Sequence, residues 1–464
     1  MTARMIASTE STASPLPAVS PSRRSRFGTW LTILFTFIIC FTAYVPLSIS
    51  IAGLNLRASQ MLLPVVFGWL LLQKTTLRMR LTSLMLVFLA LLLWTSLLFW
   101  TLVNSDSYTA LVHPLGRVFL LGLNLLHTAA LYLLVSNSNR LRDTIYSWMG
   151  SVTVLNCFLL ITAVGSALDI PLFRGMVNQE EAPVLVNGGF SSEIVSRFTF
   201  SGIIAGVISA ATLIIVVSLV AQRNRRVPRW IWFCGLMATI GIVIGFSRQG
   251  MVSLVGGLGI VGLIMILHGR IKQLLRIILL TPLVIIPGIL LINLIPGGQS
   301  FFQAFAGRTL QLFQNEAYSS GTVGSRTIMW SGMLNDVLRN PLWGNGQDNY
   351  LKYYAVIDPA GEGSHNFPLE VFHASGLVGF LAYMMFHLVI FTVVWRILFR
   401  RSTTPHDRQI MTGIIGALVA FWLSSLTNLI FTNPVYWAML GLSVAGARLS
   451  SDNSRTQRSD SMIV

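Results

Sequence analysis

The chain has 464 residues, of which 54% are hydrophobic and only 10% are charged, and its formal net charge is +16 at pH 7. A mean hydropathy of +0.70 excludes an ordinary soluble globular domain and indicates a polytopic membrane protein. The basic charge does not indicate a nucleic-acid partner, because most lysines and arginines fall in alternate connections between apolar segments. The 3 cysteines lie inside apolar segments at no zinc spacing, which is typical of buried packing residues.

The first 27 residues are rich in serine, threonine and proline and contain the basic run Arg23-Arg24-Ser25-Arg26, which predicts a disordered cytoplasmic tail. Twelve apolar segments follow, and we interpret each of them as a transmembrane helix. They lie near residues 28–46, 58–73, 82–103, 117–135, 146–168, 197–221, 230–246, 250–267, 275–294, 376–396, 409–430 and 432–448. Several are short for a hydrocarbon core of roughly 30 Å, so their boundaries are predicted to within a few residues.

The distribution of basic residues predicts the orientation, because short cytoplasmic loops carry an excess of lysine and arginine. With the N-terminus in the cytoplasm, basic clusters such as Lys74, Arg78 and Arg80 fall on the inner side, and both termini are cytoplasmic. The expected organisation is listed by range: a tail at 1–27, nine membrane helices at 28–294, an extracytoplasmic loop at 295–375, three membrane helices at 376–448 and a second cytoplasmic tail at 449–464.

Two of the predicted extracytoplasmic segments are long. Residues 169–196 contain the turn signal Asn187-Gly188-Gly189, and residues 295–375 form the longest polar stretch between apolar segments. Because long loops with some order of their own are often functional, we expect the chemistry of the protein in the second segment.

A helix-like run lies within this second segment. Met329, either Met333 or Leu334, and Val337 repeat at helical spacing, Ser325 is the expected N-cap, and Pro341 is expected to terminate the helix. The loop is therefore predicted to carry a helix.

Arg248 is the most informative arginine. It lies in the short connection 246–250 between two apolar segments, which places its guanidinium at or just below the outer membrane interface. A charged side chain in a membrane helix costs about 2.5–3.5 kcal/mol at the bilayer centre, and arginines retained at such depths are usually functional. Gly250 is expected to permit a tight turn and Ser247 to cap the next helix. The alternative is an interfacial arginine whose side chain reaches up to water.

Four other extracytoplasmic arginines lie at helix ends. For Arg57 and Arg117, which open their apolar segments, the favoured interpretation is a side chain that extends to water. For Arg197, which opens the segment at 197–221, a functional role and this interfacial role stay equally open. Arg326 opens the helix-like run, and a surface ion pair with a loop carboxylate is the alternative to a functional role there.

His365 is the strongest candidate for proton chemistry. It directly precedes Asn366 and Phe367, and Pro368 suits the first turn of a helix, so the histidine is expected where the loop joins a membrane helix. An imidazole of near-neutral pKa can accept a proton from a hydroxyl nucleophile. The alternative is a structural histidine that caps the helix.

The extracytoplasmic segments carry no HExxH motif, no paired cysteines and no phosphate-binding glycine loop. The carboxylates Asp336, Asp348, Asp358, Glu362 and Glu370 are too scattered along the chain to predict a metal site. We therefore expect a mechanism that uses neither a metal nor a cofactor.

Five short motifs occur in a characteristic order, and their order carries more weight than any one of them. They are Ser247-Arg248-Gln249-Gly250, Gly324-Ser325-Arg326 with Trp330, Asn340-Pro341-Leu342-Trp343-Gly344-Asn345-Gly346, Ser364-His365-Asn366 and Gly376-Leu377-Val378-Gly379. This order resembles the bacterial O-antigen ligase and O-antigen polymerase superfamily over roughly residues 195–395.

The resemblance implies a C-type glycosyltransferase fold that acts at the periplasmic face of the inner membrane. Its donor would be a glycan on undecaprenyl diphosphate, transferred with inversion and without a metal, a cofactor or a nucleotide sugar. A ligase would transfer this glycan to a sugar hydroxyl of lipid A–core, whereas a polymerase would add it to another lipid-linked repeat. The partners would be this donor, one of these two acceptors and the lipid bilayer.

The resemblance also implies roles for particular residues. An outer arginine of the family pairs with the donor diphosphate, which corresponds to Arg248, together with Arg197 and Arg326, and a loop histidine acts on the acceptor, which corresponds to His365. Asn366 would be a supporting neighbour of that histidine. Charge-assisted arginine–phosphate hydrogen bonds suit this task, because a diphosphate leaving without a metal needs cationic partners.

The ligase is favoured over the polymerase by a narrow margin, because both share the fold and acceptor choice depends on loop shape. A twelve-span secondary transporter is the alternative from another class of protein. Against it stand the lack of a detectable internal repeat, the lack of carboxylates within the predicted spans and the long loop before the tenth span.

Overall fold

The computed structural model describes most of the 464 residues. The described ranges are 23–44, 48–51, 54–73, 81–104, 108–168, 170, 177–186, 189–198, 202–221, 227–245, 248–294, 322–350, 364–400, 405–426 and 433–461.

Helices dominate these ranges. They are α1 (Arg23–Tyr44), α2 (Ala58–Met61), α3 (Leu63–Leu72), α4 (Leu81–Val103), α5 (Tyr108–Leu134), α6 (Ser138–Ala167), α7 (Gly202–Val220), α8 (Arg229–Ile244), α9 (Arg248–Leu267), α10 (Ile271–Asn293), α12 (Thr322–Arg339), α14 (Phe367–Leu398), α15 (Pro405–Ser425) and α16 (Pro434–Ser461). Each of the twelve predicted apolar segments overlaps at least one of these helices.

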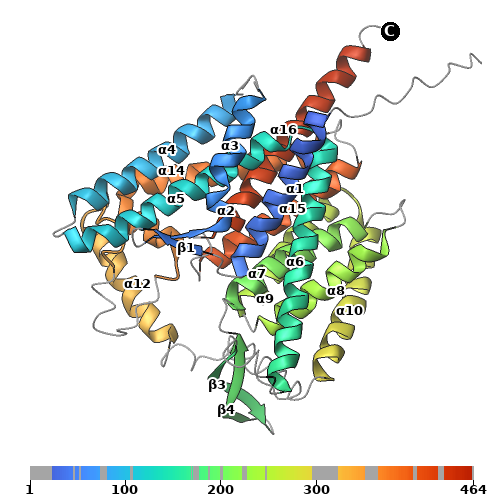
Figure 1. The fold of residues 1–464 in the computed structure, drawn as a ribbon, viewed down its shortest axis with the longest axis horizontal. Coiled ribbons are helices and arrows are strands. Elements are labelled where there is room, and N and C mark those ends of the chain that lie inside the picture. Colours follow the sequence, from blue (N-terminus) through green and yellow to red (C-terminus); the bar gives the residue numbers. More distant parts are fainter. Residues whose placement is uncertain are drawn as a thin grey trace, which may run out of the picture.

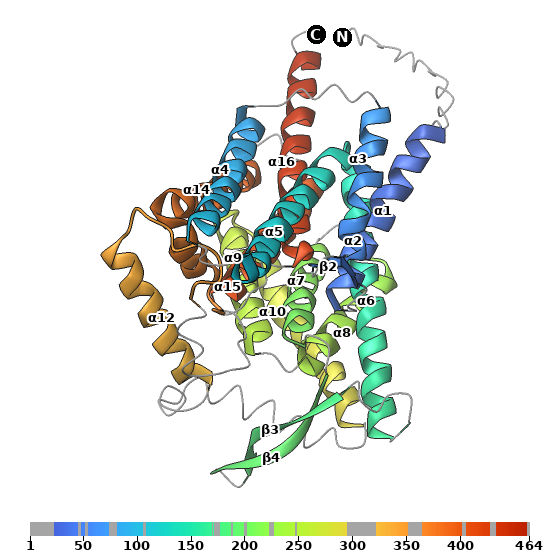
Figure 2. The ribbon, with the colours of Figure 1, turned by 60° about the vertical axis from the view of Figure 1, so that its left-hand side comes forward.

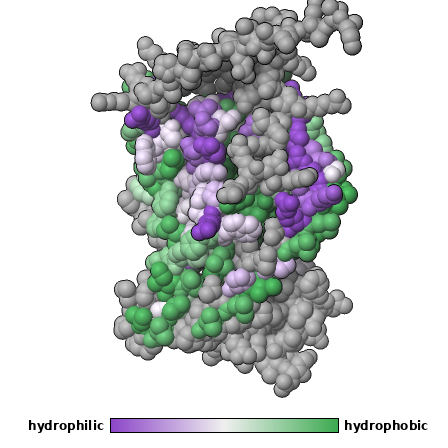
Figure 3. Space-filling view, turned by 90° about the vertical axis from the view of Figure 1, so that its right-hand side faces the viewer, coloured by the Kyte–Doolittle hydropathy of each residue, from purple (hydrophilic) through white to green (hydrophobic). Residues whose placement is uncertain are grey.

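Seven helices among the described residues are long and apolar enough to cross a membrane, and three further helices are apolar but shorter. Leucines, valines and isoleucines on these helices are widely exposed, as suits contact with lipid. Figure 3 shows hydrophobic side chains spread over one face of the molecule, with hydrophilic side chains gathered mainly in its upper part. The protein is thus an all-α polytopic membrane protein, as predicted, while the number of twelve spans stays a prediction.

The helices form one bundle, in which segments far apart in the sequence lie side by side (Figure 1). α15 packs against α7 and α9, α14 packs against α4, α16 against α5, and α1 against α6. In Figure 2, the start of α1 and the end of α16 lie at one end of the molecule, whereas α12 lies towards the opposite end.

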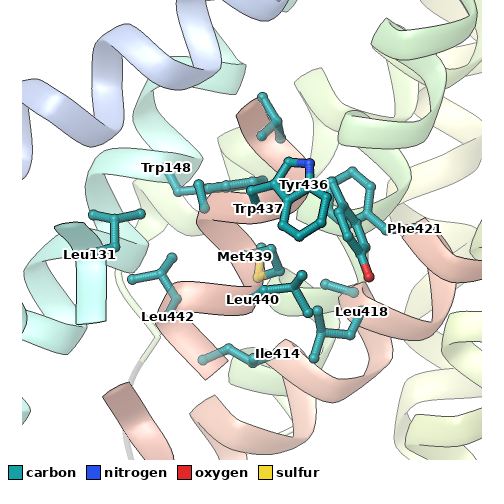
Figure 4. Close-up of a cluster of buried hydrophobic side chains, with 14 of the residues drawn as sticks. Leu131, Trp148, Ile414, Leu418, Phe421, Tyr436, Trp437, Met439, Leu440 and Leu442 are labelled. Carbon is teal, nitrogen blue, oxygen red and sulfur yellow. The ribbon is translucent and has the colours of Figure 1, made fainter. Parts of the chain in front are cut away.

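The centre of the bundle is apolar and aromatic. Trp148, Phe421, Tyr436 and Trp437 are almost fully buried, and Figure 4 shows them with leucines and isoleucines of α5, α15 and α16. The Phe421 and Tyr436 rings meet edge to face, with centroids 6.0 Å apart, an arrangement that aromatic pairs prefer. This cluster stabilises the C-terminal helices against the N-terminal half of the chain.

Two short β-ribbons, which the sequence did not predict, accompany the helices. β1 (Ser48–Ile51) pairs antiparallel with β2 (Leu54–Arg57), and β3 (Val177–Val186) pairs antiparallel with β4 (Gly189–Phe198). In the second ribbon Val186 lies opposite Gly189, so the strands flank the predicted turn, although Asn187 and Gly188 themselves lie outside the described residues.

Candidate active site

Helix α12 lies on α14 through its apolar face. Met329 and Met333 are 1% and 0% exposed and cluster with the buried Tyr350, and Leu369 of α14 packs against them. The helix that the spacing of these apolar residues predicted is therefore confirmed, and of the two alternatives Met333 is buried whereas Leu334 is exposed. The predicted N-cap was wrong, because α12 begins at Thr322 and Ser325 lies inside the helix.

A break in α14 receives the turn that follows α12. At Gly376 the backbone has φ 65° and ψ −169°, which interrupts the helix in a region that residues with a side chain rarely adopt. A Cβ at Gly376 would lie 2.6 Å from the carbonyl oxygen of Leu342. The amides of Asn345 and Gly346 donate to the carbonyl oxygens of His373 and Ala374 at 2.8 and 3.0 Å.

These contacts explain two of the sequence motifs. The stretch 340–346 lies against the break in α14. Gly376, the first residue of the motif at 376–379, permits that close approach because it has no side chain. Residues 340–346 are consequently held against α14.

His365 lies directly before α14, as its neighbours predicted. It is 7% exposed and has a φ of 55°, a left-handed conformation that is uncommon for residues other than glycine. Asn366 is the N-cap of α14, and its side-chain oxygen accepts from the amide of Leu369 at 3.1 Å. Backbone strain of this kind persists where the surroundings impose it, and such residues cluster at active sites.

Ser364 connects this loop to two helices. The indole Nε1 of Trp330 in α12 donates to the carbonyl oxygen of Ser364 at 2.7 Å. The Ser364 hydroxyl donates to Oε2 of Glu370 at 2.6 Å and accepts from the amide of Asn366 at 3.3 Å. The residues on both sides of His365 are thus fixed by hydrogen bonds.

Arg326 and His365, two of the predicted site residues, interact electrostatically. Burial, and secondly the positive charge of Arg326, lower the pKa of His365 to about 4. The imidazole is therefore neutral at pH 7, and one nitrogen of a neutral imidazole carries a lone pair that can accept a proton or a hydrogen bond. This differs from the near-neutral pKa expected from the sequence, because the sequence did not reveal the burial.

A charged cluster lies beside the loop. The Arg117 Nη1 atom is 2.7 Å from Oδ1 of Asp348, 2.9 Å from the hydroxyl of Tyr350 and 3.9 Å from Oε1 of Glu370. The side chains of Asp348 and Glu370 are each 3% exposed. The Gln347 amide donates to both carboxylates. Buried carboxylates require such partners, and Arg117 supplies the compensating charge.

Sequence reasoning missed this cluster. Arg117 was interpreted as an arginine extending to water, but it is paired with buried carboxylates instead. Asp348 and Glu370 were judged too scattered, yet the fold brings both to the same arginine, and Glu370 lies in the first turn of α14 rather than in the loop. No local signal in the sequence identifies these pairings, because the partners are more than two hundred residues apart.

A second pair also escaped prediction. Nε2 of His373, which is fully buried, lies 3.1 Å from Oδ2 of Asp336 and connects α14 to α12. Among the described residues no group of three or more histidine, cysteine, aspartate or glutamate side chains is arranged to hold a metal ion.

For Arg248 and Arg197, the other two predicted arginines, the structure describes the backbone. Arg248 is the first residue of α9, and Arg197 lies in β4 opposite Asn178, so it does not open α7 as predicted. Their side chains lie outside the described residues, as does Ser247. Gly250 lies within α9 rather than in a turn, and a Cβ there would be 3.0 Å from the backbone of Gly206, so it permits close packing of α9 on α7.

The fold and these contacts define a multi-pass α-helical membrane protein with a buried polar site between α5, α12 and α14. Residues 233–384 match a protein-family model described as O-Antigen ligase, and this match confirms the resemblance of this part of the chain to the O-antigen ligase superfamily. The matched range contains Arg248, Arg326, His365 and Asn366, whereas Arg117 and Arg197 precede it. No curated protein matches the sequence significantly.

Proposed function

We propose that the protein is an O-antigen ligase, a glycosyltransferase that moves a glycan from undecaprenyl diphosphate to a sugar hydroxyl of lipid A–core. The observation that carries this proposal is the proximity of a cationic Arg326 to a neutral, buried His365 within the range that matches the family. An arginine for a phosphate oxygen and a neutral imidazole for a hydroxyl are the two partners that this transfer requires without a metal.

In the proposed reaction, the acceptor hydroxyl oxygen attacks the anomeric carbon of the donor sugar from the side opposite the diphosphate. The new C–O bond forms as the bond to the diphosphate oxygen breaks, and the electron pair leaves with undecaprenyl diphosphate. His365 orients the hydroxyl and accepts its proton. A weak base is sufficient, because the hydroxyl becomes acidic as its oxygen bonds to the electron-poor anomeric carbon.

Arginines stabilise the charge that develops on the leaving diphosphate. We assign this task to Arg248 with Arg197, and to Arg326 at the side of His365. Arginine stays protonated and forms paired hydrogen bonds to phosphate oxygens, each worth about 1.5–3 kcal/mol. Asn366 supports the site by starting α14 directly after the histidine.

The proposed orientation places both termini in the cytoplasm and the site at the periplasmic face of the bacterial inner membrane. It is supported by the alternation of basic loops along the sequence and by the position of α12 far from the start of α1 and the end of α16 (Figure 2).

The test is transfer by purified protein in detergent. Lipid-linked glycan is supplied with lipid A–core and, separately, alone, and the products of wild type, His365→Ala, Arg248→Ala and Arg326→Ala are compared. Arg339→Ala, at the exposed end of the same helix as Arg326, is the matched control.

A product on lipid A–core that is lost in His365→Ala and Arg248→Ala but kept in Arg339→Ala would support the ligase. Longer chains formed from the donor alone would identify a polymerase that uses the same site. If neither product forms although the donor binds, the proposal is wrong and a transporter becomes the better hypothesis.

A further inference from the structure

A cavity of about 220 Å³ lies between α4, α5 and the first turns of α14. Its polar wall consists of Arg117, Asn124, Gln347 and Glu370, and the rest of its lining is apolar, including Leu121 and Phe367. A single buried water needs only about 10–15 Å³ of such volume, so this space is far larger than one water requires. It is smaller than the clefts of roughly 300–1,000 Å³ that take drug-sized ligands, and so suits a smaller group.

The polar wall of the cavity is held in place by hydrogen bonds. Asn124 is fully buried, and its Oδ1 accepts from Nε2 of Gln60 at 3.3 Å. Glu370 is 2% exposed and accepts from Gln347 and Ser364. A few fixed polar groups among apolar walls are characteristic of sites that bind and orient a small polar ligand.

The charge of this wall decides which ligand it suits. Arg117 faces the carboxylates of Asp348 and Glu370, and with both carboxylates ionised the formal charge of the three groups is −1. Burial raises the pKa of Tyr350, the other partner of Arg117, above its ordinary value, so this phenol stays uncharged. A diphosphate is disfavoured beside buried carboxylates, whereas hydroxyl groups can donate to carboxylates and accept from amides and arginine.

We propose that this cavity binds one uncharged sugar ring of the acceptor glycan, an inference that rests on the transferase proposed above. Glu370, in the cavity wall, bonds to Ser364, which directly precedes His365. The cavity wall is therefore connected through Glu370 and Ser364 to the residue that acts on the acceptor hydroxyl. The donor diphosphate remains with the arginines.

The experiment compares two variants that change the cavity with one that does not. Leu121→Phe fills the space, and Asn124→Leu removes a hydrogen-bonding wall at similar volume. Leu126→Phe places the same added bulk on the same helix at a side chain that is 42% exposed. Initial rates are measured against lipid A–core and against the lipid-linked repeat as acceptor, at saturating donor, and thermal unfolding is recorded for each variant.

The expected result is an acceptor KM raised about tenfold or more in both cavity variants, with donor KM and kcat within twofold of wild type. In Asn124→Leu a tenfold change corresponds to about one lost hydrogen bond, whereas in Leu121→Phe the added ring occupies the space of the sugar. Leu126→Phe should match wild type. Binding of delipidated core oligosaccharide to the protein in nanodiscs is measured by saturation-transfer NMR and should weaken in the two cavity variants. Binding of inorganic pyrophosphate should not change.

An unchanged acceptor KM in a folded Leu121→Phe variant would overturn the cavity assignment while the transfer reaction stands. A raised donor KM, or weaker binding of pyrophosphate, would assign the cavity to the donor instead and likewise overturn it. A wild-type protein that transfers no glycan to either acceptor contradicts the proposed function itself, so the two failures are distinguishable.

Discussion

Helix α14 takes part in two buried polar clusters, one at its middle and one at its start, which differ in charge and in what surrounds them. His387, in the middle of α14, bonds through Nδ1 to the carbonyl oxygen of Tyr383 at 2.8 Å and through Nε2 to the hydroxyl of Tyr436 in α16. A carbonyl oxygen can only accept, so Nδ1 donates, and in the neutral imidazole Nε2 then accepts from the tyrosine hydroxyl. This cluster is neutral and ties two helices together.

The cluster at the start of α14 is charged and borders open space. Arg117, Asp348 and Glu370 lie beside a cavity, and hydrogen bonds through Ser364 connect them to a strained His365. A neutral pair that is surrounded by aromatic rings needs no ligand, whereas buried charges next to a cavity and a strained loop are costly to maintain. The contrast indicates that burial of a histidine in this fold is a poor guide to its role, and that its surroundings are a better one.

Replacing each of the two histidines tests this contrast most strongly. His365→Ala is expected to lower kcat for glycan transfer by a factor of about 10²–10⁴, because general acid–base groups contribute effects of this size. His387→Phe should leave kcat within about threefold but lower the free energy of unfolding by about 1–3 kcal/mol, since the Tyr436 hydroxyl loses a buried partner. Transfer rates and detergent unfolding are measured for both. Equal losses of kcat in the two variants would contradict the distinction between a catalytic His365 and a structural His387.

Removing the cation of the charged cluster should have the next largest effect. Arg117→Met leaves Asp348 and Glu370 buried without their arginine, and the expected loss of unfolding free energy is about 3–5 kcal/mol. Adding Asp348→Asn to this variant should restore part of the loss, because one uncompensated charge is removed. If Arg117→Met unfolds like wild type in mixed micelles, the pairing does not stabilise the fold.

Removing the helix cap should have the smallest effect. Asn366→Ala loses the hydrogen bond to the amide of Leu369 and should cost about 1 kcal/mol of unfolding free energy. Asn366→Asp keeps an acceptor and should restore stability. A transfer rate that stays low in a stable Asn366→Asp variant would show instead that the amide group contacts substrate.

The sequence predicted the features that depend on local pattern. The apolar helices, the helix α12 and the junction at His365 follow from periodicity and proline positions. The pairing of Arg117 with Asp348 and Glu370 could not be predicted from the sequence, because it depends on how α5 and α14 approach each other in space. For the same reason the low pKa of His365 was missed, since burial is a property of the packed structure.

The most direct test of the site is a titration of His365 by NMR, with labelled histidine in wild type and in Arg326→Leu. The account predicts a pKa of about 4 in wild type and a higher value in the variant, still below 6.5, because burial is the larger cause and the arginine the smaller. Since the unfolded chain then takes up the proton first, the contribution of His365 to stability is present above about pH 6.5 and is lost as the pH falls towards 4. A His365 that titrates near 6.5 in wild type, or one unaffected by Arg326→Leu, would contradict the proposed site.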